Sequence, residues 1–123
     1  MSPIKEDPER ENRIMMEITV DAYGPEEQAM AWYYYLQDEL FFPFTATCIV
    51  ERATSPLHAG DEVEILGMAS EDECQHEMFV ETPWGGRTLA IPLSQVRPID
   101  ATDEGTKEAV ADWHYWVARG YEF

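Results

Sequence analysis

A run of carboxylates at residues 71–77 is the part of the chain most able to do chemistry. Four of its positions are acidic: Glu71, Asp72, Glu73 and Glu77. Like charges held this close together repel each other, so the run lowers stability unless a cation is bound. Carboxylate oxygens are the ligands that Ca²⁺ prefers in proteins. The run therefore predicts a calcium site, and the alternative is a set of surface acids that act only through their electric field.

The pattern around this run predicts a β-hairpin over residues 60–82. Val63 and Ile65 alternate with glutamates on the outgoing side, and Met78 and Val80 do so on the return. Successive side chains of a strand point to opposite faces, so the apolar residues share one face and the acids the other. A register shift of one residue would bury the acids, so the apolar face fixes the register.

The same alternation predicts which acids converge. Glu73 and Glu77 both occupy odd positions, so they would share one face of the returning strand. We expect this pair to bind one ion, with Glu71 or Asp72 added from the loop.

Two further acids, Asp38 and Glu39, lie at the end of a predicted helix. The C-terminus of a helix carries the negative end of its dipole, so carboxylates there are slightly destabilising unless a cation shares the site. Asp38 and Glu39 are therefore candidate calcium ligands. The alternative is that they are simple surface acids at a frayed helix end.

Residues 100–106 (DATDEGT) come closest to an EF-hand loop, the standard calcium-binding loop of proteins. Oxygen-bearing residues stand at loop positions one, three and five, with glycine at six, but position twelve is Ala111 and not the required glutamate. Capping of the following helix by Thr102 or Asp103 explains much of the segment without a metal. Asp100 and Asp103 are kept as candidate ligands of a second site.

Other site chemistries have little support in the sequence. Cys74 and His76 could form half of a zinc site, but no second Cys/His pair completes it unless Cys48 joins from a distant segment. The chain has no glycine-rich phosphate loop, no nucleophile elbow and no H-E-x-x-H helix. We therefore expect a protein that is not an enzyme.

The charge balance narrows the class of partner. The chain has 123 residues with 8 Lys and Arg against 25 Asp and Glu, a net charge of −17. The acids outnumber the bases 10 to 3 in residues 1–42, 9 to 3 in residues 43–98 and 6 to 2 in residues 99–123, so the acidity is not confined to a tail. Such a surface repels nucleic acid and anionic membranes and attracts cations or basic proteins. The alternative is that the charge serves only solubility.

The cellular location is expected to be cytoplasmic. No stretch approaches the roughly 18 apolar residues of a membrane helix, and the acidic start does not resemble a secretory signal. Cys48 and Cys74 are the only cysteines, and without an export signal reduced thiols are favoured over a disulfide.

Two helices are predicted in residues 1–42. The first begins at Pro8 after the N-cap Asp7, with Ile14, Met15, Ile18 and Ala22 on its buried face. The second begins at Pro25, and its buried stripe comprises Ala29, Trp32, Tyr33, Leu36 and Leu40. The short link predicts an antiparallel helical hairpin, which would bring Asp38 and Glu39 beside the acids Glu6, Asp7 and Glu9.

The rest of the chain predicts a small sheet and a closing helix. Five short strands within residues 43–99, with a turn at Gly85 and Gly86 and a one-turn helix before the last strand, are the layout of an SH3-like barrel. A helix over residues 106–119 follows, and its buried face comprises Ala109, Val110, Trp113, Trp116 and Val117. The expected class is α+β: one domain over residues 1–123, in which an SH3-like antiparallel β-barrel (43–99) is flanked by the helical hairpin (1–42) and a C-terminal helix (100–123).

Six stretches together resemble the small acidic calcium-binding protein family of cyanobacteria, the CcbP type. They are residues 12–17 (NRIMME), 31–36 (AWYYYL), 60–64 (GDEVE), 73–80 (ECQHEMFV), 91–95 (IPLSQ) and 112–116 (DWHYW). The resemblance implies a cytoplasmic protein without EF-hands that binds Ca²⁺ at two sites. It also implies a role in buffering free calcium and in heterocyst differentiation.

The sequence therefore leaves two hypotheses for the function. The first is a calcium buffer or sensor in cyanobacterial calcium signalling, with a regulatory protein as a further candidate partner. The second is a metal-independent acidic adaptor that docks a basic protein. Calorimetric titration with calcium separates the two, because only the first binds the ion in physiological salt.

Overall fold

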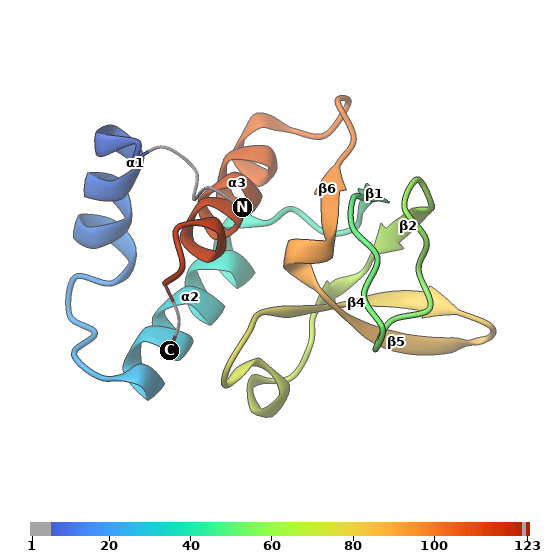
Figure 1. Ribbon diagram of the computed structural model, residues 1–123, viewed down its shortest axis with the longest axis horizontal. Helices are drawn as coiled ribbons and strands as arrows, with labels where there is room; N and C mark the ends of the chain where they lie inside the picture. The colour runs from blue at the N-terminus through green and yellow to red at the C-terminus, as the bar shows by residue number, and fades with distance from the viewer. Residues whose placement is uncertain (1–5, 122) are drawn as a thin grey trace.

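Helices occupy one side of the molecule and two small antiparallel sheets the other (Figure 1). The structure is a computed structural model that describes residues 6–121 and 123. Its α-helices are α1 (Pro8–Arg13), α2 (Pro25–Glu39) and α3 (Glu104–Ala118), and a π-helical turn, η1 (Ile14–Ile18), continues α1 directly. Among the described residues, no helix is both long and apolar enough to cross a membrane.

In the part of the chain that the structure describes, six short strands make up the two sheets. The first sheet has the order β2-β1-β6, from β1 (Phe44–Cys48), β2 (Glu62–Ile65) and β6 (Val96–Pro98). The second has the order β3-β4-β5, from β3 (Gly67–Met68), β4 (Phe79–Trp84) and β5 (Arg87–Pro92). The α+β class is confirmed, but the predicted SH3-like barrel is wrong because the strands do not close into one barrel.

The barrel fails where the predicted hairpin divides. Its outgoing side is interrupted at Leu66, so that β2 pairs with β1 while β3 pairs with β4. A 3₁₀ turn, η3 (Leu93–Gln95), likewise separates β5 from β6. The predicted alternation still holds within the strands, since Val63, Ile65 and Val80 are all buried.

Residues typical of turns and helix caps correctly predicted where several helices and strands begin or end. The Asp7 carboxylate accepts the Arg10 N–H and caps α1, as predicted. Gly85 and Gly86 both have positive φ, 56° and 80°, as the tight turn between β4 and β5 requires. The third helix begins at Glu104, before the predicted start at residue 106, because Asp103 is its N-cap.

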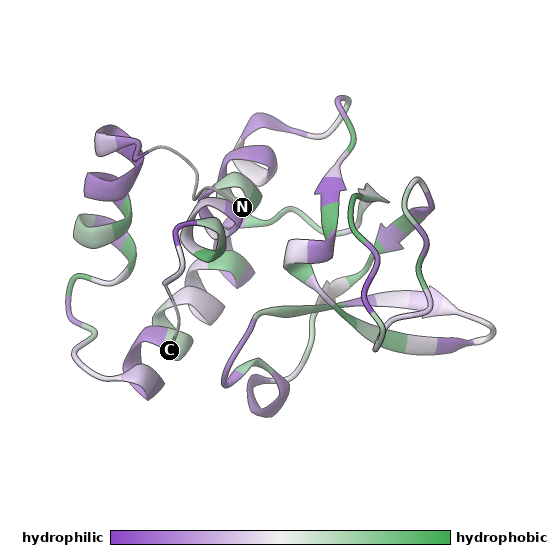
Figure 2. Ribbon diagram, in the orientation of Figure 1, coloured by the Kyte–Doolittle hydropathy of each residue, from purple (hydrophilic) through white to green (hydrophobic). Residues whose placement is uncertain are grey.

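The helices pack through aromatic side chains. The predicted stripe of α2 is buried throughout, and the Trp32 and Trp113 ring centroids lie 5.1 Å apart in an edge-to-face contact. Figure 2 shows apolar residues along the sides of the helices and strands that face each other. Two predicted core positions are wrong: Met15 is 58% exposed because the helix widens into the π-helical turn there, and Val117 faces solvent in place of the buried Tyr115.

Candidate metal centre

A short 3₁₀ helix, η2 (Glu71–Cys74), carries the acidic run beside α2. Glu71, Asp72 and Glu73 are all exposed. A 3₁₀ helix has three residues per turn, so these three side chains fan out in different directions. The predicted shared face of Glu73 and Glu77 is therefore wrong, because the strand geometry on which it depended begins only at Phe79.

Two tyrosines of α2 hold η2 in place. The Tyr33 hydroxyl donates to the Ala69 carbonyl at 2.7 Å, and the Tyr34 hydroxyl donates to the Glu71 carboxylate. That hydrogen bond and the negative charge of Glu71 raise the pKa of Tyr34. The pKa of Tyr33 is raised as well, first by burial and then by nearby negative groups that include Glu71. The Glu71 carboxylate therefore lies against α2.

Asp38 lies on the same side of α2 as Tyr34. Residues four apart on a helix are neighbours on one face, with Cβ atoms about 6 Å apart. Asp38 is exposed, and no hydrogen bond or ion pair of its side chain occurs within the described part of the chain. We call the two stretches that meet at the hydrogen bond from Tyr34 to Glu71 the α2–η2 flank. Tyr34 and Asp38 belong to α2, and Glu71 and Asp72 belong to η2.

Glu39 points to a different side of α2. With Arg13, Glu17, Tyr35, Gly105 and Glu108 it lines an open hollow of about 370 Å³. Three carboxylates and one guanidinium give this lining a formal charge of −3 + 1 = −2. Glu39 thus lies beside the end of α1 and η1, so the prediction that α2 returns it to the acidic start of α1 is wrong.

A buried carboxylate lies next to this hollow and is already paired. Asp112 is fully buried, and it accepts hydrogen bonds from Arg10 Nη1 at 2.5 Å, from Arg13 and from the Tyr35 hydroxyl at 2.8 Å. Burial, together with the hydrogen bond to Asp112, raises the pKa of Tyr35 well above its ordinary value. The network joins α1, α2 and α3, and the single charge of Asp112 is shared between Arg10 and Arg13, so it offsets only part of the charge of Arg13.

Two predicted ligands, Glu77 and Asp103, are held by other groups. Glu77 pairs with Arg52 at 2.8 Å and accepts the Ser94 hydroxyl at 3.2 Å. Asp103 accepts the Thr106 N–H at 2.9 Å and its hydroxyl at 2.8 Å, which lowers the pKa of Asp103.

Asp100 is exposed, and its backbone carbonyl accepts Lys107 Nζ at 3.1 Å. Arg52 and Glu77 lie 25 residues apart, so no local pattern indicated their ion pair. The capping role of Asp103, by contrast, was the alternative that the sequence already offered.

The candidate ligands therefore fall into separate places. Glu71, Asp72 and Glu73 lie on η2, Asp38 lies on α2 one turn after Tyr34, and Glu39 lines the hollow. Glu77 and Asp103 are held by other groups, and Asp100 is exposed. Among residues 6–121 and 123, no three His, Cys, Asp or Glu side chains are set as a ready group for a metal ion. Glu17 and Glu108 at the hollow were not among the predicted ligands, and no pattern in the sequence links them. Tyr34, by contrast, lies four residues before Asp38, so the sequence does predict that both lie on one face of the helix.

Comparison with known proteins gives a consistent result. The model of the CcbP family, described as calcium binding, matches residues 12–117. The crystal structure of Anabaena CcbP is 45% identical with a TM-score of 0.86, and a calcium binding protein in its calcium-binding form is 44% identical with a TM-score of 0.85. Each similarity covers 100% of both chains. No curated protein sequence matches the chain.

Proposed function

The chain belongs to the CcbP family of calcium-binding proteins, and on that premise we propose that it buffers or senses Ca²⁺ in the cytoplasm. The observation that carries the proposal is the family match over residues 12–117. The net charge of −17 supports it, because a strongly negative surface concentrates cations and speeds their capture.

The donor set of the α2–η2 flank suits a hard cation. Ca²⁺ takes six to eight oxygens from carboxylates, carbonyls and water, in a flexible geometry. Asp38 and Asp72 are exposed, and among the described residues the one partner of the Glu71 carboxylate is the Tyr34 hydroxyl. The exposed carboxylates are free to change rotamer, and binding would require them to turn toward one ion. We place a first calcium site here, with Glu73 as a neighbouring charge.

A second site is proposed at the hollow beside Glu39. Its other carboxylates, Glu17 and Glu108, come from η1 and α3, so an ion bound there would bridge three helices. Arg13 is compatible with this site, because it pairs with the buried Asp112. Glu108 also pairs with Arg10 and Arg13, but its side chain is 53% exposed and can turn toward an ion. Glu77 is 26% exposed and held by Arg52, and Asp103 caps α3, so both suit the role less well.

Cyanobacterial calcium signalling, including heterocyst differentiation, is part of the same proposal. The likeness to Anabaena CcbP supports it. A sensor changes its exposed surface when calcium binds, whereas a buffer changes little. Hydrogen exchange measured with and without calcium distinguishes them: slower exchange confined to the ligand segments indicates a buffer, and changes in distant segments indicate a sensor with a regulatory protein partner.

Calorimetric titration of matched variants tests the first site. Asp38→Asn and Glu71→Gln should each weaken one calcium site about tenfold or more, because ligand charge sets calcium affinity. Glu62→Gln removes the same charge from the exposed face of β2 and serves as the control. A control loss equal to that of Asp38→Asn would show that these acids act only through their field, which salt screens over about 8 Å.

The second site has its own test. Glu39→Gln should weaken a different step of the isotherm, so its effect should add to that of Asp38→Asn. If the double variant shows no further loss beyond the single ones, the two residues serve one site and our placement of Glu39 is wrong.

A further inference from the structure

Large apolar side chains are exposed where the first helix ends and turns toward α2. Met15 is 58% exposed, Met16 61%, Val20 49% and Tyr23 85%. All four lie within residues 15–23, on η1 and the connection that follows it. Methionine is flexible and polarisable and is common on surfaces that bind varied partners. Groups of large exposed apolar side chains mark interaction sites, whereas single ones are normal on a protein surface.

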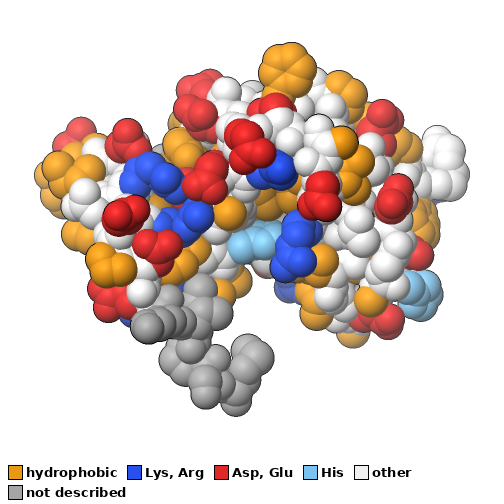
Figure 3. Space-filling view, turned by 90° about the horizontal axis from the view of Figure 1, so that it is seen from above, with side chains coloured by type: hydrophobic (Ala, Val, Ile, Leu, Met, Phe, Trp, Pro, Cys, Tyr) orange, Lys and Arg blue, Asp and Glu red, His pale blue; other side chains and the backbone are white. Residues whose placement is uncertain are grey.

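The charge along this segment is negative, and the nearest preceding basic residues, Arg10 and Arg13, are paired with Asp112. No Lys, Arg or His occurs between Ile14 and Glu51. The acids nearest to the apolar side chains are exposed: Glu17, Asp21, Glu26 and Glu27. In Figure 3, hydrophobic and acidic side chains lie at the left end of the molecule, where α1 is found, together with some Lys and Arg side chains. A partner that covers this surface must therefore carry basic groups around an apolar face.

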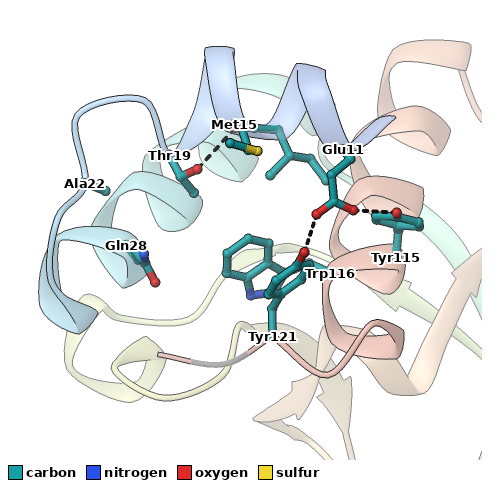
Figure 4. A pocket seen from close by; sticks show the side chains of 9 residues that line it. Glu11, Met15, Thr19, Ala22, Gln28, Tyr115, Trp116 and Tyr121 are labelled. Atoms are coloured by element: carbon teal, nitrogen blue, oxygen red, sulfur yellow. Dashed lines mark hydrogen bonds between the residues drawn. The ribbon is translucent and has the colours of Figure 1, made fainter. Parts of the chain in front are cut away.

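A hollow of about 530 Å³ adjoins the apolar side chains. It lies between η1 and the end of α3, and its lining comprises Glu11, Met15, Thr19, Gln28, Trp116 and Tyr121 among others. Figure 4 shows the Glu11 carboxylate at one side, held between the tyrosine hydroxyls, with the Trp116 and Tyr121 rings beneath it. The volume is in the range of sites that hold a large side chain or a small ligand.

Glu11 presents a fixed negative charge in this hollow. Its carboxylate accepts the Tyr115 hydroxyl at 2.5 Å and the Tyr121 hydroxyl. These two hydrogen bonds, and then the charge of Arg119, lower the pKa of Glu11, so it is ionised at neutral pH. Each carboxylate oxygen can accept a further hydrogen bond, so the group remains able to bind a cation.

The rings beside Glu11 suit the stem of a basic side chain. Trp116 and Tyr121 stack with their centroids 4.6 Å apart. A guanidinium or ammonium is attracted to an aromatic face, while its aliphatic stem packs against apolar surface. Trp116 is the buried member of this stack, and Tyr121 is 40% exposed, so an Arg or Lys side chain that enters along the Tyr121 ring can place its charge beside Glu11.

We propose that these exposed side chains and the adjoining hollow, together called the Met15 surface, dock a basic amphipathic segment of a partner protein. The apolar side of that segment covers Met16, Val20 and Tyr23, and one Arg or Lys enters the hollow beside Glu11. This gives the regulatory partner of the proposed function a definite chemistry and place. Docking uses none of the proposed calcium ligands except Glu17, which lies at the edge of both surfaces.

Binding of a synthetic peptide tests the proposal directly. The probe is a fluorescently labelled amphipathic peptide of Leu and Lys at helical spacing, titrated in physiological salt with EGTA so that calcium binding plays no part. Met16→Gln with Val20→Gln, and separately Glu11→Gln, should each raise the dissociation constant at least tenfold. Leu66→Gln and Glu62→Gln change an exposed apolar residue and an exposed acid elsewhere and should change it less than twofold.

Methionine methyl NMR gives a second readout that needs no variant. The Met15 and Met16 signals should shift on peptide addition, whereas the signal of Met78, which is fully buried, should not. Equal losses in the Met15-surface variants and their controls would overturn the proposal, since binding would then be non-specific attraction to the acidic surface. Spermine that shifts the Met15 signal while the peptide does not would also overturn it, in favour of a small-cation site.

Discussion

The buried carboxylate of Asp112 is expected to be a main support of the helical layer. Asp112→Asn keeps the size of the side chain and removes its charge, which leaves Arg10 and Arg13 without their buried partner. Removing one member of a buried ion pair typically costs about 3–5 kcal/mol. The Arg10 and Arg13 side chains are 21% and 37% exposed, so water compensates part of the loss. We therefore expect the free energy of unfolding to fall by about 3 kcal/mol, the lower end of that range.

Thermal unfolding measures this loss. At about 2.1 cal/mol/K per residue, the unfolding entropy of this 123-residue chain is about 0.26 kcal/mol/K, so 3 kcal/mol corresponds to a drop in Tm of about 12 °C. Urea denaturation should show a lower midpoint with an unchanged slope, because the surface exposed on unfolding stays the same.

Glu108→Gln is the matched control. Glu108 lies 3.4 Å from Arg10 and 3.7 Å from Arg13, so it contacts the same two guanidinium groups, but its side chain is 53% exposed. An exposed ion pair contributes at most about 1 kcal/mol. Equal Tm values for the two variants would refute the reasoning, because burial of Asp112 would then not determine the cost.

Three further outcomes are expected. Calcium at a hundredfold excess over its dissociation constant should raise the unfolding free energy by about 2.7 kcal/mol in denaturation experiments, and magnesium should do less; an unchanged Tm in millimolar calcium would contradict this. Asp103→Ala should lower stability by about 1 kcal/mol through loss of the α3 N-cap, with calcium affinity retained in the same titration. The pKa of Glu11 is lowered by folding, so its contribution to stability is complete above the ordinary glutamate pKa and is lost as the pH falls through the folded-state pKa. Glu11→Gln should therefore lose less Tm than the wild type on acidification, and parallel curves would refute this.

Signals between near neighbours in sequence predicted the helices well. The α1 N-cap depends on Asp7 and the residues directly after it, and the buried stripe of α2 follows from helical spacing. Such features depend on backbone hydrogen bonds and side-chain packing over a few turns, which a single sequence displays directly.

Pairing between distant segments could not be predicted in the same way. The division of the hairpin at Leu66 follows from which strand β2 and β3 each meet, and the alternation pattern is the same for either partner. For the same reason the sequence could not show that Glu77 is engaged by Arg52.

For the same reason, the sequence could not show which candidate ligands lie close together in space. Their acidic character was evident in the sequence, but Asp38 and Glu39 lie on two sides of α2, each one turn after a tyrosine with a different partner. Only the packing around those tyrosines shows which acids can meet.

Calorimetric titration of the calcium-free protein with Ca²⁺, at about 0.15 M ionic strength where distant surface charges are largely screened, tests the central claim most directly. We expect saturable binding at two sites with micromolar or tighter affinity. Heats that show no saturation up to millimolar calcium, or binding that disappears as salt is raised to this level, would contradict calcium binding as the function of this chain.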